Sequence, residues 1–176
     1  MLPDKFHTAR LVLRPIVLDD AGAIFDAYAQ EAAVTRFVIW RPHRSRSDTE
    51  AYVAQCIATP PNVSRTYVIL DRRRGDLRGA FAVRQAAPHR LDFGYLLARP
   101  WWGRGFMTEV LTDIVNWALQ QPPIFRIGAV CDVENLASAC VMEKAGLVRE
   151  GLLRWWLMHP NVGDEPRDCL SYAPVR

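Results

Sequence analysis

A pair of glycines between an apolar run and an amphipathic helix constrains this chain more than any other feature. Gly103 and Gly105 lie in the stretch Trp102–Glu109, directly after the apolar residues Leu91–Leu97. The backbone amides of such a turn are open to an anion, because the first helical donors lack partners within the helix and the helix dipole is positive there. The pattern therefore predicts a strand, a tight turn and a helix that together bind a phosphate-bearing ligand.

Length and composition are those of a globular protein. The chain has 176 residues, of which 50% are apolar and 23% charged, and this suits one domain over residues 1–176 with a sizeable core. No apolar run approaches the ~20 residues of a membrane-spanning helix, and the N-terminal residues lack the apolar segment of a signal peptide. The cysteines show no CxxC pair and no histidine at metal-ligand spacing, which favours reduced thiols in a cytoplasmic protein and no metal site.

Arginine supplies nearly all of the positive charge, because only two residues are lysine. Arginine recognises phosphates well, so a nucleic-acid partner is one explanation. Against it, the arginines are spread from Arg10 to Arg176 and form no basic helix. The densest run, Arg72–Arg74, is typical of a solvated hairpin turn. A compositional bias of the source is favoured over nucleic-acid binding.

Hydrophobic periodicity predicts the element order strand, two helices, three strands, helix, strand, helix and two strands. The strands are expected at residues 10–14, 66–70, 79–84, 91–97, 127–133, 147–157 and 167–172. Asp19 or Asp20 would cap the first helix, a capping box at Ser47–Glu50 the second, and Asn135 the last, which ends at Gly146. This order predicts an α/β (α+β) fold with a mixed sheet of about seven strands and helices on both faces.

Six segments, in order along the chain, resemble the GCN5-related N-acetyltransferase (GNAT) superfamily over nearly the full length. Within it, they resemble the branch that includes the ribosomal-protein alanine N-acetyltransferases. They match an opening strand, a first helix, an acyl-CoA strand, a phosphate loop and the next strand and helix: Thr8–Pro15, Asp19–Ala21, Phe93–Leu96, Trp102–Phe106, Asp132–Ser138 and Glu143–Leu147. A dinucleotide-binding fingerprint would need glycine in place of Thr108, and the chain has no P-loop run.

The resemblance implies a GNAT fold and an acyl-coenzyme A co-substrate, most often acetyl-CoA. The pyrophosphate would bind the backbone amides of six consecutive residues, Gly103, Arg104, Gly105, Phe106, Met107 and Thr108. Pantetheine would lie where the strand ending in Tyr95, Leu96 and Leu97 splays away from Val130–Asp132, with Asn135 beside it. Trp102 and Met107 depart from the pattern of many relatives, and Met107 is expected to crowd the turn.

The implied reaction is attack of a neutral primary amine on the thioester within a ternary complex. Ser138 matches a serine that some relatives place near the sulfur, and it also suits a helix cap. Asp92 matches an acidic position from which a carboxylate acts through water, and it equally suits an inert exposed residue. The glutamate that some relatives use as a base is absent from Arg154–Leu157. Transfer through a thioester on Cys131 or Cys140 is the less favoured mechanism.

In this fold the acceptor site is commonly built by the loop between the first two helices and by the last strands. Trp40, Arg41 and Trp155 lie in those segments and are candidates for binding the acceptor through apolar and cation–π contacts. These aromatic residues equally suit a core or a homodimer surface. The expected acceptor is a protein N-terminus or a small-molecule amine, with no membrane partner. The alternative function is a non-catalytic acyl-CoA-binding or sensing module on the same fold.

Overall fold

Eight strands form one mixed sheet in the computed structural model, which describes residues 2–174. The strands lie in the order β1-β2-β3-β4-β5-β6-β8-β7. Their bounds are β1 (Phe6–His7), β2 (Leu11–Pro15), β3 (Ser64–Asp71), β4 (Leu77–Ala87), β5 (Arg90–Leu97), β6 (Arg126–Asp132), β7 (Leu147–Met158) and β8 (Pro166–Pro174). All neighbouring strands are antiparallel except β5 and β6, which are parallel. The sequence predicts about seven strands, and the eighth is the two-residue β1, which is too short to show alternation.

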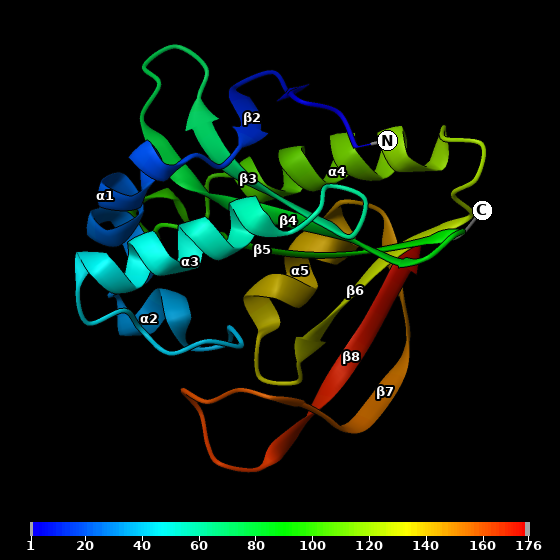
Figure 1. The fold of residues 1–176 in the computed structure, drawn as a ribbon. Helices are drawn as coiled ribbons and strands as arrows, with labels where there is room; N and C mark the ends of the chain where they lie inside the picture. The colour runs from blue at the N-terminus through cyan, green and yellow to red at the C-terminus, as the bar shows by residue number, and fades with distance from the viewer. Residues whose placement is uncertain (1, 175–176) are drawn as a thin grey trace.

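Helices cover both faces of the sheet, as the sequence predicts (Figure 1). One face carries α1 (Ala21–Ile24), which continues as the π-helical turn η2 (Phe25–Ala29), together with α2 (Ala32–Thr35) and α3 (Arg46–Ala58). The other face carries α4 (Phe106–Leu119) and α5 (Leu136–Lys144). Each face therefore has its own core, and each large apolar side chain buried there contributes roughly 1.5–3 kcal/mol. No helix within residues 2–174 is long and apolar enough to cross a membrane.

The capping box of α3 begins at Ser45, and its prediction at Ser47 is wrong. The amide of Asp48 donates to Ser45 Oγ at 3.3 Å, and the amide of Ser45 donates to Asp48 Oδ2 at 3.1 Å. The amide of Arg44 donates to the same carboxylate oxygen at 2.8 Å. Asp48 thus satisfies two free amides before the helix, whereas Glu50 at the predicted position would satisfy one.

The second half of the chain follows its local patterns. The predicted apolar stripe of α4 is buried along its whole length: Met107, Val110, Leu111, Ile114 and Ala118. Asn135 caps α5 through its side chain, and Gly146 ends that helix with a φ of +87°. The predicted closing antiparallel pair is β7 and β8, and β8 lies between β6 and β7 in the sheet.

Candidate active site

The strands β5 and β6 are paired at one end only. Their parallel register joins Arg90–Asp92 to Arg126–Gly128 and extends no further within the described residues. Beyond it, β5 stays paired with β4 up to Leu97, while β6 pairs with β8 from Ala129 onward. Each strand therefore keeps one row of backbone groups facing an opening in the sheet. The strands diverge where the sequence predicts that they splay.

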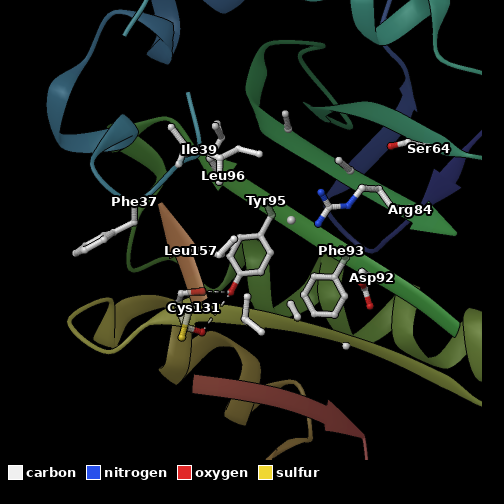
Figure 2. Close-up of a pocket in the computed structure, with 18 of the residues that line it drawn as sticks. Phe37, Ile39, Ser64, Arg84, Asp92, Phe93, Tyr95, Leu96, Cys131 and Leu157 are labelled. Atoms are coloured by element: carbon white, nitrogen blue, oxygen red, sulfur yellow. Dashed lines mark hydrogen bonds between the residues drawn. The ribbon is translucent and has the colours of Figure 1, made fainter. Parts of the chain in front are cut away.

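A cavity of about 830 Å³ includes this opening, within the range of roughly 300–1,000 Å³ that small-molecule sites occupy. Its walls come from the loop after α2, from α3, from the first turn of α5 and from the strands β3 to β8. Figure 2 shows the ring of Tyr95 reaching from β5 toward Cys131 on β6. Tyr95, Leu96, Asn135 and Ser138 line the cavity together, so it brings together four of the residues predicted to bind the coenzyme.

The turn before α4 has the backbone geometry that its glycines predict. Gly103 and Gly105 have φ angles of +70° and +72°, in the left-handed region that favours glycine. Gly105 is the N-cap of α4 and no side chain caps it. The amide of Glu109 is the first in the helix to donate to a loop carbonyl, that of Gly105 at 3.1 Å. Helix geometry leaves the amides before it without intrahelical acceptors, which suits an anion.

Arg10 reaches this turn from the start of the chain. Its backbone amide and its Nε atom donate to the Glu109 carboxylate at 2.8 and 2.6 Å, and Thr8 donates to the same group. Its Nη1 atom donates to the carbonyl of Arg104 at 3.1 Å, and the guanidinium lies 4.3 Å from the ring centroid of Phe106. Arg10 therefore neutralises Glu109 and holds the turn. The sequence gives no local signal for it, because the contacts span 94 residues or more.

The two unusual residues of the turn both have structural explanations. Met107 is 3% exposed and packs in the core under α4, so only its backbone faces the turn, and the predicted crowding is wrong. Trp102 is 47% exposed, and its indole Nε1 donates to the carbonyl of Leu97 at 2.7 Å. Trp102 therefore satisfies the last acceptor of β5. The exposed Arg104 places its guanidinium 4.9 Å from the ring centroid of Trp101.

Ser138 lies at the opening, held by residues on two sides. Its amide donates to Asn135 Oδ1 at 3.2 Å, which is the helix-capping contact. Its Oγ atom lies 2.9 Å from the hydroxyl of Tyr95, and that hydroxyl lies 3.2 Å from the Ser138 carbonyl. Burial raises the pKa of Tyr95 above the ordinary tyrosine value, so the hydroxyl stays protonated and remains a donor. Ser138 therefore lies in the first turn of α5 and also lines the cavity, and its role beside the sulfur stays a prediction.

Cys131 is buried beside this contact. Burial, with help from the nearby Cys169, Asp132 and Glu143, raises the pKa of the Cys131 thiol to about 12, while a hydrogen bond with Ser138 acts in the opposite direction. The thiol is therefore neutral near pH 7 and a weak nucleophile.

Asp92 lies at the closed end of the opening, away from Ser138. It pairs in register with Gly128, where β5 and β6 are still joined, whereas Ser138 contacts Tyr95 three residues further along. The Asp92 carboxylate lies 3.6 Å from Arg90 Nε. The structure thus brings Ser138 to the opening but does not bring Asp92 beside it, and a catalytic role for Asp92 stays a prediction.

Of the three predicted acceptor-site residues, Trp40 lines the cavity. Its ring lies 4.9 Å from that of His43 and 5.9 Å from that of Tyr52. Arg41 and Trp155 do not line the cavity. Trp156, the next residue in β7, lines it instead of Trp155. A bulge causes this exchange: Trp155 has a φ of +52° and its amide donates to Asp168 Oδ1 at 2.9 Å, so the alternation of β7 is interrupted.

A buried histidine of the segment that connects β7 to β8 also lines the cavity. His159 is 3% exposed and lines the cavity, and neither ring nitrogen has a hydrogen-bond partner in residues 2–174. Its Nε2 atom lies 3.9 Å from Asp132 Oδ2. Nearby, Asn161 Nδ2 donates to the carbonyls of Thr35 and Trp40 at 2.7 and 2.8 Å, which ties this connection to the loop after α2.

Comparison with known proteins places this geometry in one family. Residues 10–148 match the acetyltransferase (GNAT) domain. The chain is 29% identical over 173 residues to the uncharacterized N-acetyltransferase YoaA of Bacillus subtilis, covering 97% of this chain and 96% of YoaA.

The solved structures that share the fold include two acetyltransferases in complex with coenzyme A. RimL, a ribosomal L7/L12 α-N-protein acetyltransferase in complex with coenzyme A, has a TM-score of 0.80 at 20% identity, over 96% of this chain and 95% of that one. The spermidine N-acetyltransferase of Vibrio cholerae, in complex with CoA and spermine, has a TM-score of 0.75 at 19% identity, over 93% and 94%. At these identities the likeness is one of fold. Since the family match covers most of the chain, this protein is an enzyme of the GNAT acetyltransferase family.

Proposed function

We propose that this enzyme transfers an acyl group, in the first place acetyl, from acyl-CoA to a primary amine of a protein N-terminus or a small molecule. The observation that carries the proposal is the one-ended pairing of β5 and β6 beside the uncapped N-terminus of α4. That arrangement would offer the coenzyme an opening between β5 and β6 lined by unpaired backbone groups, with the N-terminus of α4 nearby to bind an anion. RimL and the spermidine N-acetyltransferase, which share the fold, both hold CoA in their structures.

The coenzyme would bind mainly through backbone groups. Its pyrophosphate would accept hydrogen bonds from the amides of Gly103–Thr108 at the positive end of α4. Its pantetheine would lie along Tyr95–Leu97 as an added strand. The Oδ1 atom of Asn135 is taken by the Ser138 amide, which leaves the Asn135 Nδ2 group available for a pantetheine carbonyl.

In the transfer, the neutral amine nitrogen attacks the thioester carbon. A carbon–nitrogen bond forms, the carbon–sulfur bond breaks with its electron pair going to sulfur, and the nitrogen loses a proton. An amide of the Tyr95–Leu97 edge would stabilise the oxyanion. When Tyr95 donates to Ser138 Oγ, the serine hydroxyl is free to donate a hydrogen bond to the leaving thiolate, which then takes a proton from solvent to become the CoA thiol.

His159 is the proposed acceptor of the amine proton. It is the imidazole in the cavity wall whose nitrogens have no protein partner in the described region. The Asp132 carboxylate 3.9 Å away would stabilise the imidazolium that forms, as a carboxylate does beside a catalytic histidine. Arg167 pairs with Asp132 and moderates this effect. The proposal supplies a base in place of the glutamate that is absent from Arg154–Leu157.

A free-thiol release assay with acetyl-, propionyl- and succinyl-CoA tests the function. The acceptors are a panel of small amines and N-terminal peptides, with Ser138→Ala beside the wild type. The proposal expects thiol release that depends on the acceptor and N-acylated product of matching mass. Saturable coenzyme binding with no product from any acceptor would instead support the non-catalytic sensing module.

A further inference from the structure

One exposed arginine of the cavity lining has no side-chain partner among the described residues. Arg84, on β4, lines the cavity, and no hydrogen bond or ion pair of its side chain occurs among residues 2–174. Figure 2 shows its guanidinium directed over the sheet toward the side of Tyr95. A guanidinium left unpaired in a cavity wall suits an anionic group of a ligand.

The other charged groups of the cavity are already paired. Arg90 lies 3.6 Å from Asp92, and Arg126 donates to Glu150 outside the cavity at 2.6 Å. Asp132 accepts from Arg167, 3.2 Å from its Nη2 atom. Both carboxylates of the cavity lining thus have an arginine within 4 Å among the described residues. Asp92, which pairs in register with Arg84 across β4 and β5, has a side chain that is 39% exposed. Arg84 is the one unpaired formal charge among the arginines and carboxylates that line it.

Two hydroxyl groups lie on the same face beside Arg84. Ser64 pairs in register with Arg84 across β3 and β4, and Thr66 is two residues further along the same strand. Alternation places these three side chains on one face of the sheet, and all three line the cavity. The hydroxyls make no hydrogen bonds within the described chain. They would complete a binding site for a carboxylate, with the planar guanidinium supplying two parallel donors.

The geometry points to an acceptor amine that carries a carboxylate, such as an amino acid or a peptide with an acidic group near its N-terminus. The inference rests on the proposed function, whose acceptor class it names. Arg84 binds the carboxylate and orients the amine toward the opening between β5 and β6. A polyamine is disfavoured, because its further ammonium groups would meet the unpaired guanidinium of Arg84 and carboxylates that already lie near arginines.

The test compares matched acceptors in the thiol-release assay. Each pair consists of an amino acid and its amide, or of a peptide with glutamate and one with glutamine at the second position, and spermidine is a separate acceptor. The wild type is expected to favour the carboxylate member in kcat/KM by about 10- to 100-fold, the range of a charge-assisted hydrogen bond. Arg84→Gln is expected to bring this ratio close to one, mainly through KM, and Arg84→Glu to reverse it. Arg73→Gln, an exposed arginine of the same hairpin outside the cavity, is the matched control.

A second readout separates this inference from the proposed reaction. The protein–CoA complex is titrated calorimetrically with the N-acetylated form of each pair member, which needs no turnover. Tighter binding of the carboxylate form, lost in Arg84→Gln, supports the inference even if no acceptor is acylated. Equal binding of both forms by the wild type, a preference unchanged in Arg84→Gln, or a preference for spermidine overturns it.

Discussion

The hydroxyl of Tyr95 lies 2.9 Å from Ser138 Oγ and joins β5 to α5 across the opening between β5 and β6. This contact fixes the Ser138 side chain at the point where the leaving sulfur is proposed to lie. Two substitutions separate its structural part from its chemical part.

Ser138→Ala removes the proposed donor to the leaving sulfur. Because a hydrogen bond to a charged group contributes about 1.5–3 kcal/mol, kcat is expected to fall about 10- to 100-fold with unchanged coenzyme affinity. Tyr95→Phe should lower stability by about 1 kcal/mol, since it removes one buried hydrogen bond, and lower kcat by less than Ser138→Ala. Steady-state kinetics and urea unfolding measure the two effects. Wild-type kcat in Ser138→Ala would exclude the leaving-group role.

Cys131→Ala is expected to leave kcat unchanged. The pKa of about 12 keeps the thiol protonated near neutral pH, so it neither attacks the thioester nor reacts readily with iodoacetamide. Alkylation of Cys131 should accelerate only as the pH rises toward about 12. Mass spectrometry of the enzyme after exposure to acetyl-CoA checks for an acyl-enzyme, with Cys140→Ala as the exposed-cysteine control. An acetylated Cys131 that turns over with the amine would contradict direct transfer.

His159→Asn tests the proposed proton acceptor. A positioned acid–base group typically contributes about 10²–10⁴-fold, so kcat/KM should fall within that range while acetyl-CoA binding is retained. A merely structural histidine predicts a lower melting temperature with kcat/KM of the folded variant unchanged, and that outcome would remove His159 from the mechanism.

Stability at low pH tests the ion pair between Arg78 and Asp71, which lies against Trp101 just before the glycine turn. The Arg78 side chain is 3% exposed, and its guanidinium lies 3.3 Å from the ring centroid of Trp101. It donates a hydrogen bond to the Asp71 carboxylate at 2.9 Å. This bond, together with those from the amides of Arg74 and Arg73, lowers the pKa of the Asp71 carboxyl to about 2. Because the folded pKa lies below the unfolded value of 3.8, this stabilisation is present above about pH 4 and is lost as the pH falls toward 2. Asp71→Asn should therefore melt below the wild type at pH 7, with the difference shrinking below pH 4. A difference that is constant across pH would contradict the ion pair's role.

Local patterns in the sequence predict much of the fold and of the turn that is proposed to bind the coenzyme. The positive φ angles of Gly103 and Gly105, the buried stripe of α4 and the Asn135 cap all depend on residues close in sequence. The parts that local patterns miss depend on distant contacts. Arg10 reaches Arg104 and Glu109, and the bulge that exchanges Trp155 for Trp156 depends on Asp168 in the neighbouring strand.

The position of Asp92 relative to the opening could also not be predicted from local patterns. Its residue type and strand agree with the resemblance, but the register between β5 and β6 places it where the strands are joined. Register between strands is set by the whole sheet, and a single strand's alternation does not contain it.

The most direct test of the central claim is calorimetric titration of acetyl-CoA into the wild type and Gly105→Glu, with Gly163→Ala as a control outside the turn. Glutamate at position 105 would adopt a left-handed φ at a cost of about 1–3 kcal/mol and would place a negative charge beside the proposed phosphate site. The wild type and Gly163→Ala should bind the coenzyme saturably, and folded Gly105→Glu should not bind it. Wild-type affinity in Gly105→Glu would contradict the assignment of the turn to the coenzyme.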